Sequence, residues 1–188
     1  MSSSAGIIII GDEILSGRTK DTNINWIANE LNELGIKLKE ARVIEDDKKT
    51  IINTVLEFSK KFTYVFTSGG IGPTHDDITT ESIAAAFKVD LEKNKIAMNL
   101  LKKHYEKSNI DFNEARQKMA IIPKGASLID NPVSVAPGFN IKNVYVFAGV
   151  PKIMQSMFHS ISSKLKGGII IKSKTITCDI GEGKIASD

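Results

Sequence analysis

Apolar positions along the chain follow two alternating patterns. Short runs of apolar and β-branched residues are separated by longer segments in which apolar residues recur every three or four positions. The first run, residues 5–10, is continuously apolar, as in a strand buried on both faces. The next segment carries Ile24, Ile27 and Leu31 at helical spacing and stops before Gly35. This alternation predicts a mostly parallel sheet with helices on both faces.

Further elements follow from the same two patterns. Strands are expected at residues 37–44, 64–67, 144–147 and 169–177, and on both sides of a bend in residues 127–141. Helices are expected around Ile51 and Val55, at residues 81–87, 93–106 and 113–119, and from Pro151 through Leu165 to Gly167 and Gly168. The three helices within residues 81–119 are predicted to form a lobe beside the sheet. In the middle one, the inward positions are expected to be Ile96, Ala97, Leu100 and Leu101.

Composition places the chain among globular proteins. Its 188 residues, 41% hydrophobic and 25% charged, suit one domain, assigned to residues 1–178 with a tail or truncated linker at 179–188. The net charge of +3 is small and scattered, so no nucleic-acid partner is expected. The longest early apolar run is too short for a signal peptide or a membrane span. Because Cys178 is the only cysteine, a reducing, cytoplasmic setting is expected.

The run "TSGGIGPTHDDIT", residues 67–79, joins a predicted strand to a predicted helix. Its Gly69, Gly70 and Gly72 lie just past a strand's carboxyl end, where open α/β sheets bind ligands, and a glycine backbone can direct several N–H groups at one phosphate. Asp76 and Asp77 would repel that phosphate unless a divalent cation lay between them. The alternative is that these aspartates only cap the following helix, a task Thr79 could share.

Two more acidic groups follow the first two predicted strands. Asp12 and Glu13 come after the first strand, and Asp46 and Asp47 after the second. For Asp47 and the neighbouring Glu45, capping or solvated loop charge is the expected role. Carboxylates gathered at one edge of a sheet repel each other unless a cation or ligand offsets their charge. The three groups together therefore predict a shared cation site.

These motifs carry a family resemblance. The run at residues 67–79, with "GDEILSG", "DTN", "NPVSVAPGF" and "AGVP", resembles the molybdopterin-binding (MoaB/Mog) family, in particular the N-terminal domain of the CinA proteins. The "GPTHDD" form also resembles the corresponding domain of eukaryotic FAD synthases. The likeness covers nearly the whole chain. It implies a three-layer α/β/α fold of MogA type with a mostly parallel central sheet, a small additional helical or β lobe, and a crevice for a pterin or nucleotide phosphate.

The resemblance also implies residue roles. It places the phosphate on the glycine loop with Thr74 and makes Asp77 functionally required, with Asp46 as the matching acidic position. Further ligand-binding positions by family match are Asp12, Glu13, Ser16, Asn23, Asn131, Pro137 and Gly138. Two positions depart from the family pattern: Ser134 stands where glycine is frequent, and Ile153 where CinA-type chains often carry glutamate.

The function expected from this resemblance is metal-dependent cleavage of a nucleotide diphosphate of the ADP-ribose or FAD type. Asp77 with Asp46 or Asp12 would hold Mg²⁺ or Co²⁺, and Asp76 or Glu13 would orient the attacking water. One alternative is the binding or adenylation of molybdopterin. Others are a non-catalytic pterin- or nucleotide-binding module and a fragment whose function lies in a missing C-terminal domain. The family likeness also suggests a dimer or trimer.

Overall fold

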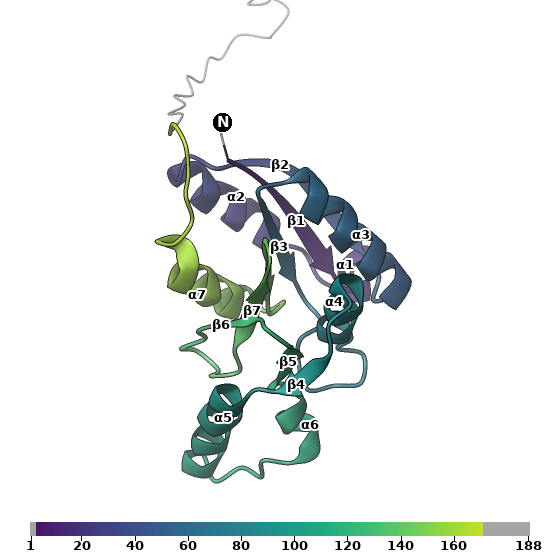
Figure 1. The fold of residues 1–188 in the computed structure, drawn as a ribbon, viewed down its shortest axis with the longest axis vertical. Helices are drawn as coiled ribbons and strands as arrows, with labels where there is room; N and C mark the ends of the chain where they lie inside the picture. Colours follow the sequence, from purple (N-terminus) through teal and green to yellow (C-terminus); the bar gives the residue numbers. More distant parts are fainter. Residues whose placement is uncertain (1–2, 171–188) are drawn as a thin grey trace, which may run out of the picture.

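The structure, a computed structural model, describes residues 3–170 of the chain. Within these residues the centre is a six-stranded sheet in the order β2-β1-β3-β8-β7-β6 (Figure 1). Its strands are β1 (Ser4–Ile10), β2 (Lys37–Ile44), β3 (Tyr64–Ser68), β6 (Ser127–Ile129), β7 (Gly138–Ile141) and β8 (Val144–Phe147). Strands β2, β1, β3 and β8 are parallel, whereas β7 is antiparallel to β8 and β6. The mostly parallel sheet expected from the apolar runs is confirmed.

The central strand β1 explains the three layers. Because side chains alternate along a strand, Ile8 and Ile10 enter one apolar cluster and Ile7 and Ile9 enter the other. The first cluster includes residues of α3 (Lys48–Lys61) and α4 (Thr79–Phe87), and the second includes residues of α2 (Asn23–Glu33) and α7 (Pro151–Ser162). Helices therefore cover both faces of the sheet, which is the three-layer α/β/α arrangement (Figure 1).

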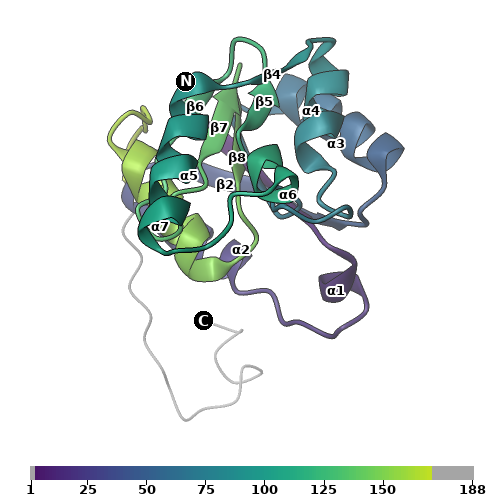
Figure 2. The same cartoon turned by 90° about the horizontal axis from the view of Figure 1, so that it is seen from below.

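A small lobe adjoins one end of the sheet and has a core of its own. It contains β4 (Leu91–Lys93), α5 (Lys95–Lys107), α6 (Glu114–Lys118) and β5 (Ile121–Pro123). Strands β4 and β5 pair antiparallel, and the lobe core is built on Ala97, Leu101 and Ala120. The short α1 (Asp12–Leu15) and the residues after it extend away from the body of the molecule (Figure 2). None of the helices in residues 3–170 is long and apolar enough to cross a membrane.

Three details of the predicted elements are wrong. Ile96 and Leu100 are 65% and 41% exposed, because only the Ala97 and Leu101 side of α5 packs into the lobe. Helix α4 belongs to the main core rather than to the lobe. Helix α7 ends at Ser162, before the predicted end.

Two other predictions extend past the structure. Residues 169 and 170 form no strand, and the rest of the predicted strand at 169–177 lies outside the described residues. Cys178 and the predicted tail at 179–188 also lie outside the described residues. The end of the predicted domain at residue 178 therefore stays a prediction.

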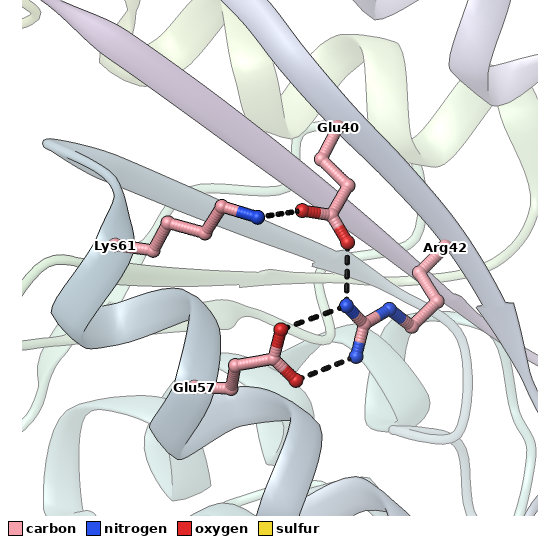
Figure 3. A network of polar contacts seen from close by, with 4 residues as sticks. All are labelled: Glu40, Arg42, Glu57 and Lys61. Carbon is pink, nitrogen blue, oxygen red and sulfur yellow. Dashed lines mark hydrogen bonds and ion pairs between the residues drawn. The ribbon is translucent and has the colours of Figure 1, made fainter.

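A network of charges ties the edge strand β2 to α3 (Figure 3). Both guanidinium ends of Arg42 bond Glu57, at 2.7 and 2.8 Å, and Lys61 Nζ lies 2.6 Å from Glu40 Oε2. Arg42 also bonds Glu40, and its pKa is raised, chiefly by the hydrogen bonds with Glu57. Charged side chains on an exposed edge strand disfavour pairing with the edge of another sheet. The network thus holds β2 against α3 and disfavours the addition of a further strand at this edge of the sheet.

Candidate functional site

A cavity of about 640 Å³ opens at the carboxyl end of the parallel strands. Its walls come from residues that follow β1, β2, β3 and β8, where ligands of open α/β sheets bind. Predicted site residues that line it are Glu13, Asp46, Gly69, Gly70, Gly72, Asp76, Asp77 and Asn131. The lining also contains apolar side chains, among them Ile71, Met119, Val150 and Ile153. The volume and the mixed lining are those of a site for a small organic molecule.

The glycine loop after β3 has a backbone that other residues would strain. Gly69 has φ +120°, and a Cβ there would lie 2.0 Å from the carbonyl oxygen of Ile10. Gly70 has φ +65°, and its Cβ would lie 2.2 Å from Thr79 Oγ1. Thr79 N also donates to Gly70 O at 3.0 Å. Glycine is therefore needed here for the positive φ and for the close approach of neighbouring chain segments.

The acidic groups after β1 and β2 meet directly. Asp12 N donates to Asp46 Oδ2 at 3.0 Å, and Asp46 N donates to Asp12 Oδ1 at 3.3 Å. Burial raises the pKa of Asp46, and the negative charges of Asp12, Glu13 and Asp76 raise it further. Three acidic groups that are far apart in the sequence are thus close enough to repel each other.

Asp77 and Asp76 take different positions in the loop. Asp77 Oδ2 accepts hydrogen bonds from Thr74 N at 2.9 Å and from Thr74 Oγ1 at 2.5 Å. Asp76 is exposed, and its pKa is lowered, chiefly by a hydrogen bond with Thr74. The cap of α4 is Ile78, which forms no side-chain cap hydrogen bond. The alternative in which these aspartates or Thr79 cap the helix is therefore wrong.

The acidic residue that does cap a helix is Asp47, for which capping was one of the expected roles. Asp47 is the N-cap of α3 and accepts from Thr50 N at 2.8 Å. The neighbouring Glu45 accepts from Thr50 Oγ1 at 3.2 Å. Asp47 and Glu45 thus bond Thr50 of α3, whereas Asp46, which lies between them in the sequence, lines the cavity.

Asn131 shapes the cavity through the loop that contains it. Its Nδ2 donates to Ser134 Oγ at 2.6 Å and to Ala136 O at 2.8 Å, and its Oδ1 accepts from the N–H groups of Val133 and Ser134. Ser134, which stands at a frequent glycine position of the family, thus fits the loop and lines the cavity.

Other predicted ligand-binding residues lie outside the main cavity's lining. Asn23 lines a small neighbouring cavity and donates to Ser68 Oγ at 2.9 Å and Gly149 O at 2.8 Å. Ser16 lies on the extended arm after α1 and donates to Glu13 O at 3.3 Å. Pro137 and Gly138 are buried where β7 begins. Thr74 and Asp12 contact the cavity residues Asp77 and Asp46 and do not line the cavity themselves.

The residues present fit a cation only in part. Within residues 3–170, no three Asp, Glu, His or Cys side chains form a group that could hold a metal ion by themselves. Mg²⁺, however, is often bound by one or two carboxylates together with phosphate oxygens and water. Burial and the nearby carboxylates both disfavour the charged form of Asp46 and raise its pKa, and a cation at this position would favour the charged form. The arrangement fits a cation that binds together with a phosphate, not one held by the protein alone.

Two lining residues have no signal in the sequence. Thr19 and Met119 line the cavity but belong to no polar cluster and to no pattern that marks a site. Met119 reaches it from the lobe, directly after α6. Such residues become recognisable only once the fold brings the lobe against the glycine loop.

Sequence and structure comparisons agree with this geometry. The chain belongs to the molybdopterin-binding domain family: residues 6–166 match the profile described as "Probable molybdopterin binding domain". Within that family it is similar to CinA proteins. The crystal structure of CinA from Thermoplasma acidophilum, a protein described as having unknown function, has a TM-score of 0.79 and 34% identity and covers 87% of this chain and 98% of that one. A CinA-like protein from Prochlorococcus marinus is 36% identical over 192 residues, 96% of this chain and 44% of the relative.

More distant likeness concerns the fold alone. The molybdopterin biosynthesis enzyme MoaB from Thermus thermophilus has 15% identity and a TM-score of 0.59, covering 87% of this chain and 91% of that chain. The sheet and its helices are thus of the MoaB/MogA type. The chain spans less than two thirds of the length of the curated relatives it matches.

Proposed function

We propose that the chain binds a nucleotide or pterin phosphate in the 640 Å³ cavity and cleaves a diphosphate with the help of a divalent cation. The observation that carries this proposal is that the glycine loop and four carboxylates, Glu13, Asp46, Asp76 and Asp77, line the same cavity. Backbone amides suit phosphate oxygens, and carboxylates suit the cation that accompanies them.

Each group has a separate task in this proposal. The N–H groups of Gly70 and Gly72 would donate to the phosphate oxygens, and the apolar wall around Met119 and Ile153 would receive the planar ring. Asp76 is exposed, has a pKa lowered chiefly by a hydrogen bond with Thr74, and would orient the attacking water. The water oxygen would bond to one phosphorus while the bond from that phosphorus to the bridging oxygen breaks. The second phosphate would leave with the bridging oxygen, and a carboxylate would take the proton of the water.

Asp77 and Asp46 would hold the cation, Mg²⁺ or Co²⁺, with Asp12 supporting Asp46 through their mutual hydrogen bonds. When bound, the cation supplies charge that offsets the negative charge on the phosphoryl oxygens. The bound cation would also offset the charge of Asp46, whose pKa is raised by burial and, to a smaller extent, by the neighbouring carboxylates.

The test is a substrate panel with purified protein. ADP-ribose, FAD, and molybdopterin with ATP are incubated with and without Mg²⁺ or Co²⁺, and AMP and adenylated products are measured. We expect AMP from ADP-ribose or FAD only when the cation is present. If molybdopterin is adenylated and no AMP is released from ADP-ribose or FAD, the proposed activity is adenylation and not hydrolysis.

The informative variant is Asp77→Asn. Its amide oxygen can still accept from Thr74, so the loop can keep its hydrogen bonds while the charge is lost. Turnover should fall roughly 100-fold or more. Asp90→Asn, which changes an exposed aspartate of the lobe, is the matched control and should leave turnover unchanged. Equal rates in the two variants would reject the assignment of Asp77.

One observation favours a second candidate, binding without turnover. Without a ligand, no group of three metal-binding side chains exists in residues 3–170. Carboxylates can also accept directly from the N–H groups of a pterin or an adenine. Binding of the panel compounds that needs neither a cation nor Asp77, with no AMP released from any of them, would support this candidate and exclude the hydrolase.

A further inference from the structure

One side chain of the lobe crosses to the acidic part of the glycine loop. Lys118, the last residue of α6, donates from Nζ to the carbonyl oxygens of Thr74, at 2.7 Å, and Asp77, at 2.9 Å. Both distances are those of charge-assisted hydrogen bonds. The ammonium group therefore joins the two ends of the turn that carries Asp76.

The ends of this turn are also joined by hydrogen bonds between Thr74 and Asp77. Its own backbone hydrogen bond, from Asp77 N to Thr74 O, is long at 3.4 Å. The Asp77 side chain accepts from Thr74 N and Thr74 Oγ1, whereas Lys118 is the side chain that donates to the carbonyl oxygens of both residues. The positive charge of Lys118 also contributes to lowering the pKa of Asp76. Lys118 thus acts on both aspartates without lining the main cavity.

A second cavity lies beside this contact. It has a volume of about 190 Å³, lies between the loop and the lobe, and is lined by Ile71, Gly72, Asp77, Lys118 and Ile121 among others. Ile71, Gly72 and Asp77 also line the main cavity, so this part of the loop is a thin wall between two spaces. Ile71 is anchored by both apolar clusters of the main core, so the contact of Lys118 acts on the polar end of the loop at residues 74–77.

We propose that Lys118 is a positioning residue of the candidate site. From the small lobe it holds the turn at residues 74–77 in the conformation that directs Asp76 and Asp77 to the main cavity. The lobe is then part of the site and not a separate appendage. The effect on ligand binding rests on the proposed function, whereas the effect on the turn does not.

Hydrogen–deuterium exchange tests the effect on the turn directly. In Lys118→Met, which keeps the apolar stem, the amides of Thr74 and Asp77 should exchange roughly 10- to 100-fold faster. Lys118→Arg keeps the charge and donors and should restore most of the protection. Lys103→Met removes an exposed lysine of α5 in the same lobe and is the matched control. Should Lys118→Met not fold, Lys118→Gln, a shorter neutral donor, replaces it.

Ligand measurements test the consequence for the site. With ADP-ribose and Mg²⁺ as the probe, Lys118→Met should bind or turn over the probe roughly tenfold less well, with Lys118→Arg intermediate and Lys103→Met unchanged. Wild-type exchange rates at Thr74 and Asp77 in Lys118→Met would overturn the proposal. If the wild-type protein binds no panel compound, the proposed function fails, and the exchange rates still decide whether Lys118 holds the turn.

Discussion

Replacing Gly69 by alanine should disrupt the start of the glycine loop without removing any polar group. At φ +120° a side chain costs about 1–3 kcal/mol. The new Cβ would also lie 2.0 Å from Ile10 O, a backbone atom of the central strand that cannot move aside, and overpacking of this kind costs about 1–3 kcal/mol. The free energy of unfolding should therefore fall by roughly 2–6 kcal/mol, which lowers the melting temperature by roughly 4–24 °C in a protein of this size.

The control for Gly69→Ala is Gly125→Ala in the lobe. Gly125 also has a positive φ, +82°, but no atom lies within 4 Å of its Cβ position. Only the backbone cost remains, about 1 kcal/mol, and the gain from a stiffer unfolded chain is the same in both variants. Thermal unfolding followed by circular dichroism measures both. Equal losses of stability in the two variants would show that contact with Ile10 does not shape the loop.

Other predictions concern stability and assembly. Leu101→Ala, in the lobe core, should cost about 2–5 kcal/mol in urea unfolding, and the partly exposed neighbour Leu100→Ala clearly less; equal costs would contradict the orientation of α5. Asp47→Ala should lower stability at neutral pH. Because the pKa of Asp47 is lowered from 3.8, the stability difference between the wild type and Asp47→Ala is present above pH 3.8 and disappears as the pH falls through the lowered pKa. A stability difference that persists below the lowered pKa would contradict the cap. Arg42→Leu should lower the melting temperature more at low salt than in 1 M salt, and an equal effect would exclude the charge network. Light scattering should show the dimer or trimer expected from the family, and a monomer would refute it.

The order of the main elements could be predicted because their signals are local. Strand β2 has the predicted bounds, and the continuous apolar run of β1 is buried on both faces, as such a run indicates. The lobe was predicted less well. Strands β4 and β5 have three residues each, too few for a period, and the apolar residues of α5 lie on more of its surface than the small lobe can cover. Short elements and small cores leave a weak pattern.

The candidate site divides in the same way. Glycines and aspartates at strand ends mark the cavity in the sequence alone, because parallel strands place their carboxyl ends at one edge of the sheet. Which carboxylates meet, and how, depended on tertiary structure: Asp46 contacts Asp12, whereas the adjacent Asp47 turns away to cap α3. The hydrogen bonds of Lys118 depended on it entirely, since a lysine on a short polar helix looks like any solvated residue. Local periodicity determines elements, but contacts between residues distant in sequence form only when those elements pack together.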